Sequence, residues 1–165
     1  MILGKTVDVI PVEYIEEPLQ DAFTSRLPEL ACEWTLPIAL DETLVESDPS
    51  EIQYFDRLAA FVLKPTLLGG FARACKYVAR ARELKIKTVI SSSFESAVGL
   101  AMLGHFVSQV APDTPCGLDT SEWMKENLLE RPLPVSSGQM LLDQSRTLPT
   151  DVNLSLLTEV ERGQA

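Results

Sequence analysis

Short apolar runs recur along this chain at nearly even intervals. Five of them end in a polar residue or a glycine, and successive ends lie 23 to 27 residues apart. A strand, a loop, a helix and a return loop together need about that many residues. The pattern therefore predicts consecutive βα units, with strands at Val12–Ile15, Ile38–Leu40, Phe61–Leu63, Thr88–Ile90 and Cys116–Leu118.

The intervals between these runs carry helical signals. Phe71–Leu84 repeats apolar residues at helical spacing, and Ser96–Val110 is apolar almost all round, as in a helix packed between neighbours. Helices are also predicted over Asp21–Cys32, after the capping series Asp48-Pro49-Ser50-Glu51, and over Glu122–Leu129. Residues 133–142 read as extended chain, and residues 144–165 as a loosely ordered tail.

The predicted strands are apolar on both faces, which is typical of a parallel sheet covered by helices. Alternating strands and helices then give an α/β fold. About five strands are too few for an eight-stranded (β/α)8 barrel of ~250 residues, so the chain is either an open doubly wound sheet or part of a barrel. In a barrel, the C-terminal strand ends face one mouth. The five run ends would gather there: Glu16, Asp41, Lys64, Ser91 and Gly117.

Composition narrows the range of partners and locations. The 165 residues carry a formal net charge of −10, which argues against nucleic acid or an anionic membrane surface as partner. No apolar stretch approaches the ~20 residues of a membrane span, and no signal peptide is visible. The three cysteines lie in apolar contexts and are expected to be reduced core residues. A cytoplasmic location follows as an expectation.

The motifs at the run ends resemble those of the o-succinylbenzoate synthase family in the enolase superfamily. Order and spacing agree over roughly Val12–Asp143. The matching segments are Ile15-Glu16-Glu17-Pro18, Ala39-Leu40-Asp41-Glu42, Val62-Leu63-Lys64-Pro65-Thr66, Val89 to Ser96 and Gly117-Leu118-Asp119-Thr120. The resemblance implies an enolase C-terminal domain-like fold: a partial (β/α)8 barrel of strands four to eight over residues 1–143, followed by the tail.

The resemblance also implies roles for the run ends. Glu16 and Asp41 match two carboxylate ligands of Mg²⁺, with Mn²⁺ as the alternative, and Lys64 matches a catalytic lysine of the sixth barrel strand. Ser91, Ser93 and Gly117 match substrate-binding positions, although the serines would serve equally well to cap the following helix. The family is a lyase that removes a proton next to a carboxylate and expels hydroxide. Its partner is a small-molecule carboxylate substrate, a cyclohexadiene, which becomes o-succinylbenzoate on the route to menaquinone or phylloquinone.

Hard oxygen ligands suit this chemistry, because a divalent cation must stabilise the anion formed when a very weakly acidic α-proton is lost. Lys64 at the end of a strongly apolar strand is rare enough to favour function over a surface lysine that extends to water. Glu16 and Glu17 would, without the other motifs, read as ordinary solvated carboxylates.

Several family features have no counterpart in this chain. They are the first metal-ligand aspartate, the Lys-x-Lys pair that supplies the base, and the N-terminal capping domain. Lys85-Ile86-Lys87 lies at a helix-to-strand turn at the wrong end of the barrel. Activity is therefore expected only with the missing barrel half, and either that half or self-association should cover the open sheet edges.

Other assignments stay open at this point. Relatives such as muconate cycloisomerase, N-acylamino-acid racemase and dipeptide epimerase share the metal ligands and the lysine. A non-catalytic truncated fragment would keep the same motifs by descent. If the source is a photosynthetic eukaryote, the expected location is the plastid stroma.

Overall fold

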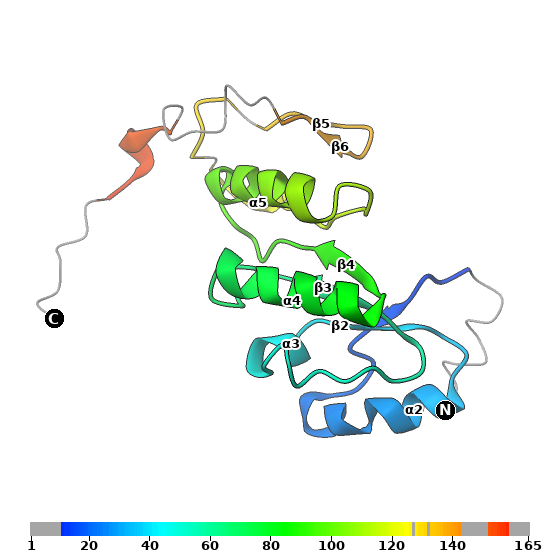
Figure 1. Ribbon diagram of the computed structural model, residues 1–165. Coiled ribbons are helices and arrows are strands. Elements are labelled where there is room, and N and C mark those ends of the chain that lie inside the picture. The colour runs from blue at the N-terminus through cyan, green and yellow to red at the C-terminus, as the bar shows by residue number, and fades with distance from the viewer. Residues whose placement is uncertain (1–10, 127, 132, 143–151, 159–165) are drawn as a thin grey trace, which may run out of the picture.

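Four parallel strands form the centre of the molecule (Figure 1). The computed structural model describes residues 11–126, 128–131, 133–142 and 152–158. The strands pair in chain order, β1-β2-β3-β4, and each pair is parallel. A parallel bridge between Ser91 and Gly117 extends the sheet beyond β4. The strands are β1 Ile15–Glu16, β2 Ile38–Leu40, β3 Leu58–Leu63 and β4 Lys87–Ile90.

Helical segments connect the strands and cover one face of the sheet (Figure 1). In chain order they are η1 Asp21–Arg26, α2 Leu27–Glu33, α3 Thr43–Glu46, α4 Phe71–Leu84 and α5 Ala97–Val110. The short η2 Ser121–Trp123 follows, then an antiparallel hairpin of β5 Val135–Ser136 and β6 Gln139–Met140, and then η4 Leu154–Leu156. The α/β fold and the partial barrel predicted from the sequence are confirmed by this parallel sheet and its helices.

Local sequence explains the bounds of the two long helices. Gly70, with φ +117, turns the chain into α4, and Lys85 ends that helix in the left-handed conformation. The Ser96 side chain caps α5 by accepting a hydrogen bond from the Gly99 N–H at 3.5 Å. Pro28 lies in the first turn of α2, where a missing N–H is tolerated.

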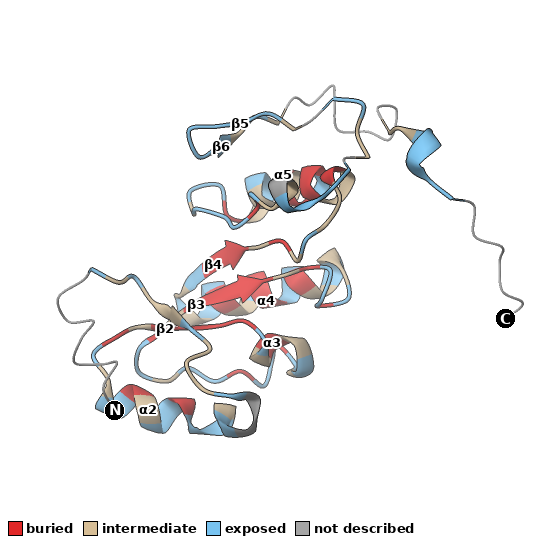
Figure 2. Cartoon of the chain, turned by 180° about the vertical axis from the view of Figure 1, so that it is seen from behind, coloured by how far each residue is buried: buried red, intermediate tan, exposed pale blue. Residues whose placement is uncertain are grey.

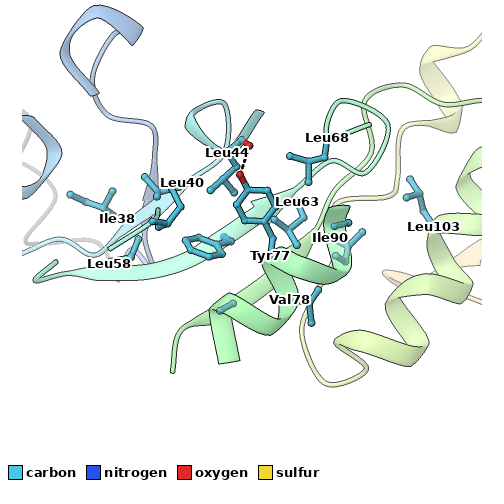
Figure 3. Packing of buried hydrophobic residues seen from close by; sticks show 14 of the residues in the cluster. Ile38, Leu40, Leu44, Leu58, Leu63, Leu68, Tyr77, Val78, Ile90 and Leu103 are labelled. Carbon is cyan, nitrogen blue, oxygen red and sulfur yellow. Dashed lines mark hydrogen bonds between the residues drawn. The ribbon is translucent and has the colours of Figure 1, made fainter. Parts of the chain in front are cut away.

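Side chains alternate between the two faces of the sheet, as parallel strands require. The large apolar residues of the strands pack against the helices, where Tyr77, Leu44 and Leu103 complete the core (Figure 3). Small residues occupy the opposite face. That second buried cluster comprises Ala39, Ala60, Val62 and Val89, with Tyr14 packed against it. β2, β3 and β4 are accordingly buried along most of their length, whereas β1 is half-buried to exposed (Figure 2).

Two predicted helices are wrong. Asp48-Pro49-Ser50-Glu51 forms a turn instead of a helix start, because the Asp48 carboxylate accepts hydrogen bonds from the Ser50 N–H at 2.9 Å and its hydroxyl at 2.5 Å. The helix of this unit is α3, which precedes the turn. In the region predicted as Glu122–Leu129, η2 ends at Trp123 and residue 127 lies outside the described residues.

Three smaller expectations also need correction. The fifth strand, predicted over Cys116–Leu118, is reduced to the single bridge at Gly117. All three cysteines are free, as expected, but they are exposed and not part of the core. In α4 the apolar spacing would bury Cys75, but Cys75 is exposed and Tyr77 is fully buried in the core.

The C-terminal part is described only in pieces. Val152 forms an antiparallel bridge with Leu129, and the Asn153 N–H donates to the Leu128 carbonyl at 2.7 Å. Residues 143–151 and 159–165 lie outside the described residues, so the loosely ordered tail and its boundary stay a prediction. Within the described ranges, no helix combines the length and the apolar character that crossing a membrane requires.

Tyr77 provides a test of the core. Its hydroxyl donates toward the Leu44 and Ser47 carbonyls, 2.6 Å from each oxygen, and so holds the loop after β2 on α4 (Figure 3). Tyr77→Phe leaves buried carbonyl groups short of a donor and should lower the free energy of unfolding by about 1–2 kcal/mol, measured by urea titration. The exposed Tyr54 gives the matched control, Tyr54→Phe. Equal stability of the two variants would contradict this account of the core.

Candidate active site

The run-end residues lie at one edge of the sheet, because parallel strands place their C-terminal ends together. Glu16 ends β1, Asp41 follows β2, Lys64 follows β3 and Ser91 follows β4. Gly117 joins the row through its bridge to Ser91. The structure therefore brings the five predicted positions to consecutive strand ends.

Glu17 fixes the first two strand ends relative to each other. Its carboxylate accepts hydrogen bonds from the backbone N–H groups of Asp41 and Thr43, both at 2.9 Å, and from the Thr43 hydroxyl at 3.1 Å. The backbone of Glu17 is in the left-handed region, with φ +36. Glu16 pairs in register with Ala39, and therefore shares its face of the sheet with Ala39 and Asp41. Of the two adjacent carboxylates, Glu17 is structural and Glu16 faces the mouth.

Asp41 and Lys64 form a salt bridge across the ends of β2 and β3. The Lys64 ammonium donates to Asp41 Oδ2 and lies 3.8 Å from Glu42 Oε1. The Asp41 side chain is only 5% exposed, and that of Lys64 is 21% exposed. Breaking such a pair leaves a buried charge without compensation, which is costly.

The pKa values at this edge record a concentration of negative charge. Partial loss of water and the charge of Asp41 raise the pKa of Glu16, while Lys64 acts in the opposite direction. Burial also raises the pKa of Asp41, against the hydrogen bond and charge of Lys64. Burial alone would lower the pKa of Lys64, but the hydrogen bond and charge of Asp41, with Glu42 and Glu16, raise it. Lys64 is therefore held as an ammonium ion, whereas burial disfavours the ionised form of Asp41.

Glu16 and Asp41 both have raised pKa values, and the charge of Asp41 contributes to the rise at Glu16. Carboxylate oxygens of this kind suit a hard divalent cation. Glu16 and Asp41 fit such an ion as two of its ligands. Within the described residues, however, no group of three or more His, Cys, Asp or Glu side chains could hold a metal ion. This edge thus supplies part of a metal site.

Ser91 and Gly117 lie in direct contact. The Ser91 hydroxyl donates to the Gly117 carbonyl at 3.3 Å, and a Cβ atom at position 117 would come within 2.7 Å of Ser91 Oγ. Ser92 anchors the same loop, because its N–H donates to the Gly117 carbonyl at 2.9 Å and its hydroxyl lies 2.9 Å from Thr120 Oγ1. Residue 117 must therefore be glycine, because a larger side chain there would collide with the Ser91 hydroxyl.

Ser93 is oriented by Glu95, a residue that the sequence analysis did not single out for the site. The Glu95 carboxylate accepts from the Ser93 N–H at 2.7 Å and the Ser93 hydroxyl at 2.8 Å. It also accepts from the Thr66 hydroxyl at 2.6 Å. The spacing Ser93-x-Glu95 is the signal that could have found this contact, since an acidic side chain two residues on can fold back onto a serine.

The amino-acid sequence matches a known protein family. Residues 2–147 match the model of the enolase C-terminal domain-like family, and the chain is a member of that family. The resemblance read from the motifs is thereby confirmed.

Particular relatives point the same way. Over 134 residues the chain is 35% identical to the o-succinylbenzoate synthase of Pectobacterium atrosepticum, covering 79% of this chain and 41% of that protein. It is 34% identical to the synthase of Yersinia pseudotuberculosis. The chain thus spans about two fifths of the length of the curated relatives it matches.

Solved structures show the same fold. The structure of MenC from Desulfotalea psychrophila superposes with a TM-score of 0.74 at 32% identity, covering 84% of this chain and 39% of that one. A dipeptide epimerase from Methylococcus capsulatus, complexed with Mg and a dipeptide, superposes with a TM-score of 0.66 at 22% identity. That second likeness shows the fold alone.

Lys64→Met tests the salt bridge. The substitution keeps the aliphatic stem but leaves Asp41 buried without a partner, so the free energy of unfolding at pH 7 should fall by about 2 kcal/mol. The deficit should shrink as the pH is lowered, because protonation removes the unpaired charge. Lys87→Met is the control, since Lys87 pairs with Glu13 at an exposed position and should cost less than ~1 kcal/mol. Equal losses in urea titrations would refute the distinction.

Glu95 predicts a specific response to acid. Burial works to raise its pKa, but the hydrogen bonds from Thr66 and Ser93 outweigh burial and hold the pKa below the ordinary value of 4.5. Its ionised form therefore stabilises the fold fully above that value, and the contribution is lost as the pH falls through the lowered pKa. Glu95→Gln should cost ~0.5 kcal/mol at pH 7, after solvent screening, and nothing in strong acid. The exposed Glu51→Gln is the control, and equal losses for the two variants in urea titrations would contradict this role of Glu95.

Proposed function

We propose that this chain supplies the metal-binding and substrate-binding strand ends of an o-succinylbenzoate synthase-type lyase. The observation that carries the proposal is the convergence of Glu16, Asp41 and Lys64 at one edge of the sheet. Membership in the enolase C-terminal domain-like family supports it. The relatives at 34–35% identity are named as this synthase.

The roles follow from the geometry. Glu16 and Asp41 would hold Mg²⁺ through their carboxylate oxygens, with at least one further ligand from outside the described residues. When bound, the ion would offset the charge that develops on the substrate carboxylate. Lys64, partly exposed at the mouth, would place an ammonium against the anionic substrate. Ser91 and Gly117 would border the carboxylate at the far end of the substrate.

Identity to the relatives favours the synthase over the other reactions of the superfamily. The MenC structure is 32% identical to this chain. The muconate lactonizing enzyme and the racemase and epimerase structures lie at 17–22%. Since the substrate determinants of a barrel lie in its strand-end loops, this difference bears on the reaction as well as on the fold.

The chain is proposed to act together with the remainder of a barrel. Two metal carboxylates and a lysine account for binding and charge, but Lys64 is held as an ammonium ion and is therefore not available as the base for the α-proton. By the family resemblance, the base and the first aspartate ligand come from barrel strands that precede those described here.

The experiment supplies the missing strands. The chain is mixed or co-expressed with the preceding part of the Pectobacterium synthase, ending where the match begins, and incubated with Mg²⁺ and the cyclohexadiene substrate. We expect the absorbance of the aromatic product only when both parts are present. Lys64→Ala in this chain should lower the rate by about 10²–10³. Retained activity in Lys64→Ala would refute the role of the lysine.

A binding measurement separates the metal ligands from the chemistry. Mn²⁺ is titrated into the same assembly and followed by electron paramagnetic resonance. Asp41→Asn and Glu16→Gln should each weaken binding by about tenfold or more, because each removes one carboxylate ligand. Glu51→Gln, which removes an exposed carboxylate remote from the edge, should bind as the unmodified chain does. Unchanged affinity in the first two variants would end the proposal that they are ligands.

A further inference from the structure

We propose that Glu95 is a positioning residue that locks the loop after β3 to the loop after β4 and so sets the spacing between Lys64 and Ser91. This inference rests on the proposed function for the roles of Lys64 and Ser91. The lock comprises Glu95, Thr66 and Ser93, and this set is called the Glu95 lock below.

The Glu95 lock joins two loops that follow neighbouring strands. Glu95 Oε1 accepts the hydroxyl of Thr66, two residues after Lys64, at 2.6 Å. The same oxygen accepts the Ser93 hydroxyl at 2.8 Å, and Oε2 accepts the Ser93 N–H at 2.7 Å. Hydrogen bonds to an ionised acceptor are shorter and stronger than neutral ones. One carboxylate therefore ties together both sides of the edge that carries the site.

Helix α5 holds the Glu95 stem in place. A Cβ atom at Gly99 would come within 2.7 Å of Glu95 Cβ and 3.1 Å of its Cγ, so the first turn of α5 has room for the stem only because residue 99 is glycine. The carboxylate is thereby attached to a 14-residue helix and not only to a loop. A site on a rigid element is held more accurately than one on a free loop.

The backbone at Phe94 carries the strain of this arrangement. Phe94 has φ +62, in the left-handed region that bulky residues rarely adopt. It lies between Ser93 and Glu95, and the two hydrogen bonds between these neighbours close the loop around it. Such strain persists where the surrounding contacts over-determine the backbone, and it concentrates at functional sites. The lock thus stabilises a conformation that the free loop would avoid.

The hydrogen bonds of the Glu95 lock also change the role inferred for Ser93, from substrate binding to positioning. Its N–H and its only hydroxyl proton are both donated to Glu95. An ionised substrate carboxylate is an acceptor and needs donors. Ser93 therefore has no proton left for it, whereas the Ser91 hydroxyl makes one long contact of 3.3 Å and can rotate away. Ser93 belongs to the positioning set, and Ser91 is the serine open to the ligand.

The test compares Thr66→Val with Thr66→Ser. Both are small changes of similar size, but only serine keeps the hydroxyl that binds Glu95. Amide hydrogen exchange of the intact chain is followed by NMR. Thr66→Val should speed exchange of the Ser93 amide by about tenfold, although it leaves the partner of that amide untouched, and Thr66→Ser should stay within about twofold of the unmodified chain. Unaltered Ser93 exchange in Thr66→Val would overturn the lock without bearing on the proposed function.

A second readout links the lock to the site. In the assembly with the preceding barrel part and Mg²⁺, o-succinylbenzoate is titrated and the Ser91 and Gly117 amides are followed. Thr66→Val and Glu95→Gln should each weaken binding by about tenfold. Thr66→Ser, which keeps the hydroxyl, should bind as tightly as the unmodified chain. Tyr77→Phe, which lowers stability elsewhere, should leave the affinity unchanged. If Tyr77→Phe weakens binding equally, the effect is general loss of stability and the positioning role is wrong. Absence of binding to the unmodified assembly would instead count against the proposed function.

Discussion

Polar contacts between neighbouring loops hold the C-terminal edge of this sheet. Parallel strands bring their ends to one edge, and every backbone or side-chain polar group left there needs a partner. In this chain each neighbouring pair of strand ends is joined by side chains. The contacts, in order across the sheet, are Glu17 with Asp41 and Thr43, Asp41 with Lys64, Thr66 with Glu95, and Ser92 with Thr120. These contacts link the residues proposed to bind metal and substrate, while buried loop residues such as Leu44 and Leu68 anchor the same loops in the core.

The apolar layers beneath this edge explain its electrostatics. Large side chains are turned toward the helices, and the opposite face carries small residues such as Ala39 and Ala60, both fully buried. Asp41 lies directly above this layer, on the same face as Ala39 by the alternation of the strand. Few water molecules can reach it from below, so burial raises its pKa and makes the Lys64 ammonium its main compensation. The charge arrangement of the site is thus a consequence of how the strands pack.

The sequence predicted the elements well wherever one signal was strong. The strand Ile38–Leu40 and the helix Phe71–Leu84 match the structure residue for residue, because apolar periodicity and burial agree there. It failed at Asp48, where the residues of a helix cap also make a turn, and local sequence does not decide between the two. For the site, the polar ends of the apolar runs correctly predicted which residues lie at the strand ends. The sequence alone does not show that Glu17 binds the neighbouring loop while Glu16 faces the mouth, because that difference depends on the strand register. The spacing Ser93-x-Glu95 could indicate the local contact, but the bond from Thr66 to Glu95 comes from the loop after a different strand, which no local pattern reveals.

Asp41 would contact two cations in the proposed site, the Lys64 ammonium and the metal ion. A carboxylate has two oxygens and can accept several donors or ligands at once. The Lys64 ammonium engages Oδ2, and Glu42 lies 3.8 Å from the same ammonium. Oδ1 would be the Asp41 oxygen that binds the proposed cation together with Glu16. The salt bridge would therefore do more than neutralise charge: it fixes the lysine at a set distance from the proposed metal position. Since the ammonium and the proposed cation would flank one carboxylate, the anionic group that both attract would lie between the ends of β1 and β3, on either side of β2 in the strand order.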